Sequence, residues 1–310
     1  MILSNMILLC LVWGLLKSFN VSKMATSLTL CNDNISASIN TFGAELIYLN
    51  RLDKENVLWS MDATFWNRTA PNLFPIVGKL KNNTYHISGN DFTMTQHGFA
   101  RDQMFEVLEY SNTSVTFLLK SNKETRKNYP FDFEFKVKYL LQESVLKIEY
   151  STRNLGGSPM PYSVGGHPGF QIQRNISNYS LLFPDGINTL TRHLLDDSCF
   201  SGETENLIVE GGLKLNEQLF ERDAIVIKLP SFDQLTLIDE TNSALLSVQS
   251  DNWEAIGIWT KKDAPFLCIE PWWGFADSKN TSGNLFQKDG IHILEPGQTE
   301  TVSYSILVHE

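Results

Sequence analysis

Hydrophobic and polar residues alternate one by one along most of the chain after its first two dozen residues. In residues 131–139, Phe, Val and Tyr stand at every second position with Asp, Glu and Lys between them, and residues 35–40, 146–150 and 304–308 repeat this pattern. A period of two places one set of side chains in a core and the other in water, which is typical of antiparallel sheets. The pattern therefore predicts a chain built almost wholly of β-strands.

Turn-forming residues separate the predicted strands. Clusters of Asn, Asp, Gly, Pro and Ser occupy residues 32–34, 88–90, 156–158 and 184–186, and such clusters mark reversals of the chain. No repeat, linker or low-complexity tract divides the sequence between them. We therefore expect an all-β fold, a large antiparallel β-sandwich, formed by a single domain over residues 24–310.

The first 23 residues do not follow this pattern, because residues 6–16 (MILLCLVWGLL) are continuously apolar. A helix of that length rises only about 16 Å, whereas a bilayer core is about 30 Å thick, so we expect no stable membrane span. Three interpretations stay open: an extension ahead of a true start at Met24, a secretory or anchoring leader, or a docked helix. The first predicts a cytoplasmic protein and the second a secreted or membrane-anchored one.

Charge and cysteine content narrow the classes of function. The chain has 35 acidic and 25 basic residues, a formal net charge of −10, and lacks the Lys/Arg-rich run of a nucleic-acid binder or a polybasic membrane anchor. Outside the leader, Cys31, Cys199 and Cys268 form no CxxC pair, which argues against a disulfide scaffold or a structural zinc site. The composition favours a small or uncharged ligand and reduced, half-buried thiols.

Four segments break the alternation and combine polar residues with Gly, Pro and aromatic residues. Because departures from a regular local pattern are expected at functional sites, these segments are the candidates for chemistry. They are residues 68–78, 96–101, 162–170 and 268–277.

His97, His167 and Glu270 are the ionisable residues of these segments best suited to proton transfer. Both histidines have a glycine neighbour, and imidazole gives or takes a proton near neutral pH. Glu270 lies between an apolar run and two tryptophans, where desolvation raises the pKa of a carboxyl group. Aromatic residues nearby could stack on the apolar face of a sugar ring: Phe170, Trp272, Trp273 and Phe275. The combination predicts an acid–base site for a carbohydrate.

Simpler interpretations of the same residues stay open. A histidine in a β protein is more often structural than catalytic, and aromatic clusters usually belong to a core. His97, His167 and Glu270 could also hold zinc, although no HxH or HExxH spacing supports this. The remaining histidines stand in polar contexts and are expected at the surface: His86, His193, His292 and His309.

Five motifs in order along the chain resemble the aldose 1-epimerase (galactose mutarotase-like) family, with the closest likeness to its LacX-type branch. They are residues 42–45 (FGAE), 71–78 (PNLFPIVG), 96–102 (QHGFARD), 165–170 (GGHPGF) and 269–277 (IEPWWGFAD). The resemblance implies an open sugar-binding groove in the sandwich and interconversion of the α and β anomers of a hexose, without cofactor or metal. The ligand that the resemblance implies is a small-molecule sugar or sugar phosphate. The resemblance is compatible with either a monomer or a homodimer.

The resemblance also assigns roles. Glu270 would be the general base that takes the C1 hydroxyl proton, and His167 the general acid that protonates the ring oxygen. Glu270 would then limit activity at low pH and His167 at high pH. His97 would hydrogen-bond the sugar, and Asp223 and Trp272 are further candidates for substrate binding.

Two arginines mark a departure from the galactose-type branch, whose paired-arginine segment cannot be aligned here. The pattern HGFAR, which ends at Arg101, is also seen in the hexose-6-phosphate 1-epimerase branch. Arg68 and Arg101 could bind a phosphate, or they could form salt bridges that shape the groove. The alternatives are therefore a hexose-6-phosphate 1-epimerase and a non-catalytic carbohydrate-binding protein. A glycoside hydrolase would need a second carboxylate about 5–10 Å from the first.

Overall fold

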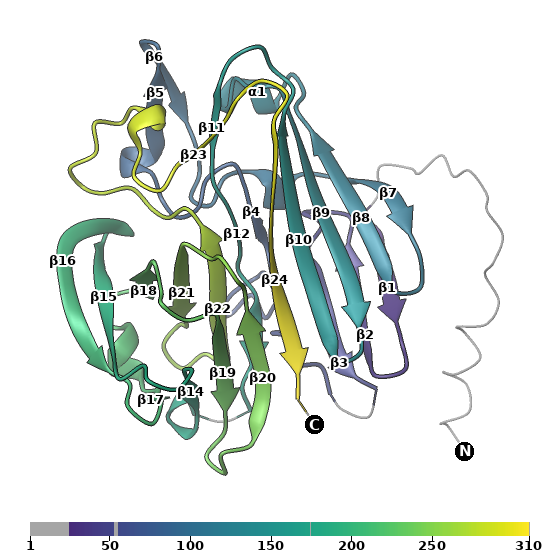
Figure 1. Cartoon of the computed structure of the whole chain (residues 1–310), viewed down its shortest axis with the longest axis vertical. Helices are drawn as coiled ribbons and strands as arrows, with labels where there is room; N and C mark the ends of the chain where they lie inside the picture. The colour runs from purple at the N-terminus through teal and green to yellow at the C-terminus, as the bar shows by residue number, and fades with distance from the viewer. Residues whose placement is uncertain (1–24, 53–54, 174, 310) are drawn as a thin grey trace.

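Two large β-sheets dominate the molecule, with smaller sheets at their margins (Figure 1). The computed structural model describes residues 25–52, 55–173 and 175–309, so the predicted leader lies outside the described residues. Every pairing between named strands is antiparallel, which confirms the predicted all-β, antiparallel sandwich. Within the described ranges, no helix has both the length and the apolar character needed to cross a membrane.

The larger sheet contains the long alternating segments that the sequence predicts as strands. Its nine strands are, in order across the sheet, β17 (Leu213–Lys214), β14 (Ser180–Leu182), β19 (Gln234–Ile238), β20 (Ala244–Gln249), β24 (Thr299–Val308), β10 (Val145–Asn154), β9 (Phe133–Gln142), β8 (Ser114–Lys120) and β7 (Glu106–Tyr110).

The second sheet carries three of the four irregular segments identified in the sequence. Its strands are, in order, β16 (Cys199–Ile208), β15 (Thr189–Asp196), β18 (Ile225–Lys228), β21 (Ala255–Trp259), β22 (Phe266–Trp273), β12 (Val164–Gly166) and β4 (Asn72–Leu73), and β13 (Gly169–Gln171) also pairs with β22. β22 therefore lies beside the segment that contains His167.

Short elements complete the structure. The small sheets join β1 (Ser27–Cys31), β2 (Ile35–Asn40) and β3 (Leu46–Arg51), then β5 (Thr84–Ile87) with β6 (Asn90–Thr93), and β11 (Met160–Tyr162) with β23 (His292–Leu294). The helices are α1 (Thr125–Asn128) and the 3₁₀ turns η2 (Lys81–Asn83), η3 (Ala100–Asp102), η4 (Ile176–Asn178), η5 (Glu217–Phe220) and η6 (Leu285–Gln287).

The hydrophobic core lies between the two large sheets. Along β9, inward and outward side chains alternate as the sequence predicts. Phe135 of β9 stacks on Phe74 beside β4, with ring centroids 4.4 Å apart, and Tyr150 of β10 meets the edge of Trp273 of β22 at 6.3 Å. Because each fully buried aromatic or aliphatic side chain contributes about 1.5–3 kcal/mol, such contacts hold the sheets face to face.

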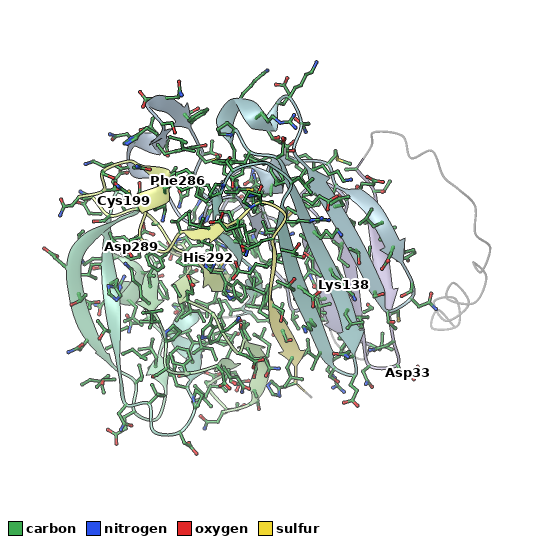
Figure 2. The ribbon with its side chains drawn as sticks, turned by 45° about the horizontal axis from the view of Figure 1, so that its top comes forward. Asp33, Lys138, Cys199, Phe286, Asp289 and His292 are labelled. Carbon is green, nitrogen blue, oxygen red and sulfur yellow. The ribbon has the colours of Figure 1, made fainter. Side chains whose placement is uncertain are left out.

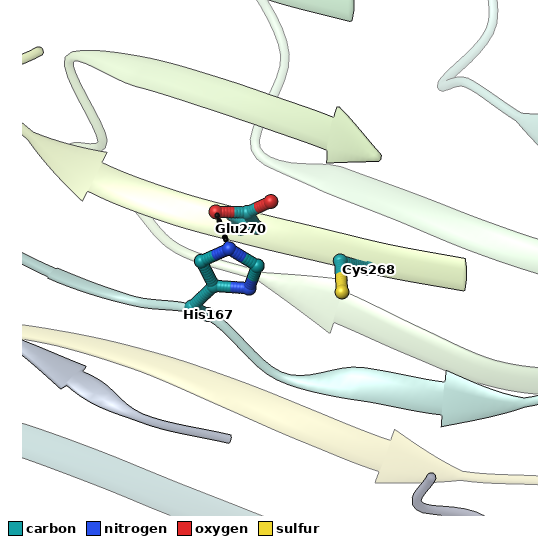
Figure 3. Close-up of side chains that lie close together, drawn as sticks. All are labelled: His167, Cys268 and Glu270. Carbon is teal, nitrogen blue, oxygen red and sulfur yellow. Dashed lines mark ion pairs between the residues drawn. The ribbon is translucent and has the colours of Figure 1, made fainter. Parts of the chain in front are cut away.

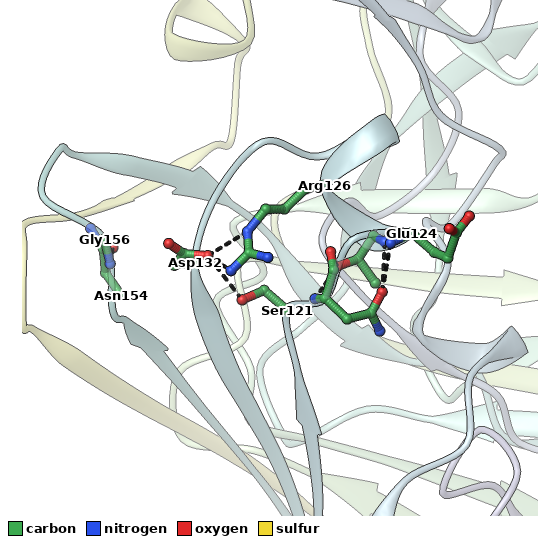
Figure 4. A network of polar contacts seen from close by, with 8 residues as sticks. Ser121, Glu124, Arg126, Asp132, Asn154 and Gly156 are labelled. Atoms are coloured by element: carbon green, nitrogen blue, oxygen red, sulfur yellow. Dashed lines mark hydrogen bonds and ion pairs between the residues drawn. The ribbon is translucent and has the colours of Figure 1, made fainter.

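A polar network closes the end of the larger sheet where the chain passes from β8 to β9 (Figure 4). The Asp132 carboxylate accepts hydrogen bonds from the Ser121 hydroxyl at 3.2 Å and from Arg126 Nε at 2.6 Å. At the end of β10, the Asn154 side chain accepts from the Gly156 backbone N–H at 2.8 Å. Solvent-exposed ion pairs contribute about 1 kcal/mol or less to the free energy of unfolding. We therefore infer that this network mainly fixes the conformation of the turns.

His292 overturns the expectation of a surface residue. Its side chain is 16% exposed and contacts the carboxylates of Glu254 at 3.0 Å and Glu300 at 3.3 Å. Figure 2 shows His292 near the middle of the view, whereas Asp33 and Lys138 lie toward one side. Burial lowers the pKa of His292, but the two carboxylates outweigh burial and raise this pKa to about 9. The carboxylates belong to Glu254, which precedes β21, and to Glu300 of β24, so the residues next to His292 in sequence do not reveal them.

Because the pKa of His292 is raised in the folded protein, part of the free energy of unfolding depends on pH. The imidazolium stabilises the fold fully below the unfolded-state pKa of about 6.5, and the contribution is lost as the pH rises through about 9. We expect His292→Gln to lower the free energy of unfolding by about 1–2 kcal/mol at pH 6, after allowing for solvent screening, and by much less at pH 10. Urea unfolding of both proteins at both pH values measures the difference. An equal loss at the two pH values would contradict the assignment.

Candidate active site

A cavity of about 280 Å³ opens on the second sheet at the predicted site. We call it the site cavity. Six of the seven predicted site residues line it, and the seventh, Arg68, lies beside it. The six are His97, Arg101, His167, Asp223, Glu270 and Trp272.

His167 and Glu270 form a buried pair of ionisable side chains (Figure 3). Glu270 lies on β22 and His167 on the segment between β12 and β13, and their Nε2 and Oε2 atoms are 3.1 Å apart. The side chains are 9% and 2% exposed. The contact is close, but it is not aligned as a hydrogen bond, so Oε2 has no hydrogen-bond partner among the described residues. A free acceptor next to a basic nitrogen can exchange a proton with a ligand.

Burial favours the neutral form of both groups. Burial and the nearby Asp223 carboxylate raise the pKa of Glu270, while the Trp272 indole lowers it in part. Burial, with a smaller effect from the Arg101 guanidinium, lowers the pKa of His167 to about 3. Between the lowered pKa of His167 and the raised pKa of Glu270, the pair therefore holds one proton. Transfer of that proton from Glu270 to His167 gives a carboxylate base beside an imidazolium acid.

His97 is fixed as a neutral hydrogen-bond donor at the wall of the cavity. Its Nδ1 accepts from the Gly78 backbone N–H at 3.2 Å, which leaves the proton on Nε2. Burial and the cationic form of His167 lower the pKa of His97 well below its usual value. Gly98 follows with φ +71°, and a Cβ there would lie 2.2 Å from the Phe74 carbonyl oxygen. The glycine beside the histidine is thus a requirement of the fold.

Two tryptophans that the sequence analysis did not identify hold the His167 ring. Trp66 lies over the imidazole with centroids 4.9 Å apart and an interplanar angle of 32°, and Trp259 meets it edge-on at 5.8 Å. Both also line the site cavity. Aromatic packing therefore orients the imidazole.

Asp223 faces the cavity from a strained position. Its φ is +69°, a conformation that costs free energy for residues other than glycine. The buried Arg192 Nη2 donates to the backbone carbonyls of Arg222, Asp223 and Ala224 at 3.0–3.3 Å. The Ser198 hydroxyl donates to Asp223 Oδ2 at 3.0 Å. Arg192 thus acts as a clamp on the backbone that presents the Asp223 carboxylate.

The two predicted arginines form internal contacts at the edge of the cavity. Arg68 pairs with Asp102 at 2.7 Å, and Arg101 Nη2 donates to the Gln96 carbonyl at 2.6 Å. Burial lowers the pKa of Arg101 to about 10, so it stays cationic. These contacts support the groove-shaping interpretation for Arg68, while Arg101 remains available to a ligand.

The other motif residues shape the walls of the cavity. Glu45 Oε1 accepts from the backbone N–H groups of Thr69 and Ala70 at 2.7 and 3.0 Å, which fixes the segment that carries Trp66. A Cβ on Gly165 would lie 2.8 Å from the Trp272 ring, so only glycine lets that indole pack against β12. These two residues position others rather than contact a ligand.

Most of the predicted stacking residues belong to the core instead. Phe170, Trp273 and Phe275 are buried and do not line the cavity, so the expectation that they stack on a sugar is wrong for them. Phe170 and Trp273 pack in the main core, because alternate positions on a strand face opposite sides. Phe275 follows the end of β22 and packs in a separate apolar cluster with Phe200 and Trp272. Only Trp272 of that group lines the cavity, together with Trp66 and Trp259.

Comparison with known proteins identifies relatives over nearly the whole described chain. A sequence model of the aldose 1-epimerase family matches residues 26–307. The chromosomal LacX protein of Lactococcus lactis subsp. lactis is 29% identical over 91% of this chain and 99% of its own length.

Solved structures of galactose mutarotase-like proteins are also similar to this chain over most of its length. A galactose mutarotase related enzyme from Lactobacillus acidophilus is 34% identical, with a TM-score of 0.88 over 92% of this chain and 98% of that one. A galactose mutarotase-like protein from Lactobacillus casei is 28% identical, with a TM-score of 0.86 over 92% of this chain and 100% of that one. The chain belongs to the aldose 1-epimerase family.

Proposed function

We propose that the protein is an aldose 1-epimerase that interconverts the α and β anomers of a free hexose. One observation carries the proposal: an acid and a base, His167 Nε2 and Glu270 Oε2, lie 3.1 Å apart in a cavity of about 280 Å³. Anomer exchange requires proton transfer at the C1 hydroxyl and at the ring oxygen, and both oxygens are bonded to the same carbon. Two adjacent proton-transfer groups match that requirement.

The reaction proceeds by ring opening and reclosure. Glu270 takes the proton of the C1 hydroxyl while His167 gives a proton to the ring oxygen, and the bond between C1 and the ring oxygen breaks. The aldehyde rotates about the bond between C1 and C2. The C5 hydroxyl then adds to the other face of the aldehyde, returns its proton to His167, and Glu270 protonates the new C1 hydroxyl. Each proton transfer contributes about 10²–10⁴-fold to the rate, and the pair ends with the proton count it had at the start.

The remaining cavity residues bind and orient the sugar. His97 offers an N–H donor, Asp223 a carboxylate acceptor and Arg101 a cation, while Trp66, Trp259 and Trp272 supply apolar surface. Sugars present hydroxyl groups and an apolar ring face, so this mixture of groups fits them.

The pKa directions predict which group controls each limb of the pH profile. The pair holds a single proton between the His167 pKa of about 3 and the raised pKa of Glu270. Below the pKa of His167 both groups are protonated, so Glu270 cannot accept a proton. Above the pKa of Glu270 both groups are deprotonated, so His167 has no proton to give. We expect a bell-shaped profile of kcat/KM whose acid limb belongs to His167 and whose alkaline limb belongs to Glu270. This is the reverse of the assignment that followed from the family resemblance.

Asp223→Asn tests this assignment, because removing a negative charge near Glu270 lowers the pKa of Glu270. The alkaline limb of kcat/KM should move to lower pH in this variant, whatever happens to KM. Initial rates across the pH range, corrected for buffer-catalysed mutarotation, measure the shift. An alkaline limb at the same pH in both proteins would contradict the assignment.

A hexose 6-phosphate is the second candidate substrate, and the cationic Arg101 at the cavity favours it. Polarimetry on fresh α-glucose, α-galactose and glucose 6-phosphate separates the candidates. Faster mutarotation of the free sugars supports the proposal, and acceleration of the phosphate alone supports the alternative. Sugar binding without acceleration of any of them would favour a non-catalytic carbohydrate-binding protein.

A further inference from the structure

Cys268 brings a thiol next to the acid–base pair. On β22, Cys268 and Glu270 are two residues apart and therefore share one face of the strand. His167 lies beside both of them, as Figure 3 shows. One donor atom from each of the three residues lies within 4.8 Å of the other two. The group differs from the pair of histidines and Glu270 that the sequence suggested as zinc ligands, because Cys268 takes the place of His97.

The spacing of the donor atoms suits a transition-metal ion after a small contraction. Three points no more than 4.8 Å apart fit within a circle whose radius is about 2.8 Å, and zinc bonds to N, O and S ligands are about 2.0–2.3 Å long. Each donor would therefore have to move inward by less than about 1 Å. Rotation of the side chains can supply a movement of this size while the strands and the backbone stay in place.

Two donor atoms in this group have unmet bonding capacity. His167 Nδ1 and Glu270 Oε2 are buried and have no hydrogen-bond partner among the described residues. The proposed proton transfers use one nitrogen of His167 and leave Nδ1 without a role. Imidazole, thiolate and carboxylate are the ligands that Zn²⁺ prefers, and three protein ligands with an open position form the typical accessible zinc site.

We propose that His167, Cys268 and Glu270 bind a thiophilic divalent cation, best matched by Zn²⁺, and that a bound metal and sugar turnover exclude each other. The cation displaces two protons to solvent, the thiol proton of Cys268 and the proton held by the His167–Glu270 pair, and the site cavity supplies the open coordination position. The second half of the proposal rests on the proposed function, because the same imidazole and carboxylate that hold the metal would transfer protons. The metal is thus an inhibitor and not a cofactor.

Metal titration without sugar tests the site independently of activity. Co²⁺ added to the metal-free full-length protein should give the near-ultraviolet band of thiolate-to-cobalt charge transfer, and Zn²⁺ should abolish that band with a stoichiometry of one. Cys268→Ser should weaken Zn²⁺ binding by more than about 100-fold, since even changes outside the ligand shell cost about 10–100-fold. Cys199→Ser is the matched control, because Cys199 is also a buried free thiol.

A second arm measures mutarotation in the presence of Zn²⁺. We expect Zn²⁺ to inhibit the wild-type protein in competition with sugar, and Cys268→Ser to keep its basal rate while losing this inhibition. Cys268→Ala serves the same purpose if the serine variant does not fold. Absence of a thiolate–Co²⁺ band, or Zn²⁺ affinity unchanged by either Cys268 variant, would overturn the metal site. A band with no mutarotase activity in any condition would uphold the site and reject the proposed function.

Discussion

Glu270→Gln is expected to lower the rate of mutarotation by about 10²–10⁴-fold while leaving sugar binding within a few-fold of wild type. The carboxamide keeps the shape of the side chain and one acceptor oxygen, but it cannot take the C1 hydroxyl proton. The pKa of Glu270 is raised by burial, so a neutral amide fits the same position without loss of stability. Steady-state polarimetry measures the rate, and calorimetric titration with sugar measures the binding.

Glu149→Gln is the matched control for this variant. Glu149 also lies on a strand, β10, but it pairs with Lys147 at 3.8 Å on a partly exposed face. Its substitution should leave both the rate and the binding unchanged. A Glu270→Gln variant that turns over sugar at a near-normal rate would reject Glu270 as the base.

His167→Asn should reduce the rate by a similar factor of about 10²–10⁴, because asparagine cannot protonate the ring oxygen. The residual activity should have a different pH profile. With the acid removed, only the ionisation of Glu270 remains, so the residual rate should rise with pH through a single ionisation and no longer pass through a bell.

His86→Asn is the control for the histidine variant, since His86 lies on the β5–β6 hairpin and does not line the site cavity. It should keep the bell-shaped profile and the wild-type rate. A His167→Asn variant that retains a bell with the same acid limb would show that another group donates the proton.

The strands could be predicted because their signal is local. The alternation in residues 131–139 directly predicts which side chains of β9 are buried. The contact between His167 and Glu270 is not local, because it depends on the pairing of strands β12 and β13 with β22. Spacing along the chain carries no information about that contact, and only the resemblance of the ordered motifs to a known family pointed to it.

The residues that sequence analysis missed show the same limit, with one exception. Trp66 reaches His167 through the fold, and nothing in its neighbours marks it. Arg192 did carry a signal, since it stands between Leu190 and Leu194 at an inward position of β15. A charged residue at a core position of an alternating strand requires polar partners, and here it finds the three carbonyls around Asp223.

Exchange spectroscopy by nuclear magnetic resonance tests the central claim most directly, because it observes both anomers at equilibrium. With glucose or galactose, the wild-type protein should transfer magnetisation between the α and β C1-proton signals at a rate proportional to enzyme concentration. Glu270→Gln should reduce this transfer to nearly the rate in buffer. Transfer no faster than in buffer with the wild-type protein, for both free sugars, would contradict the assignment of the molecule as an aldose 1-epimerase of free hexoses.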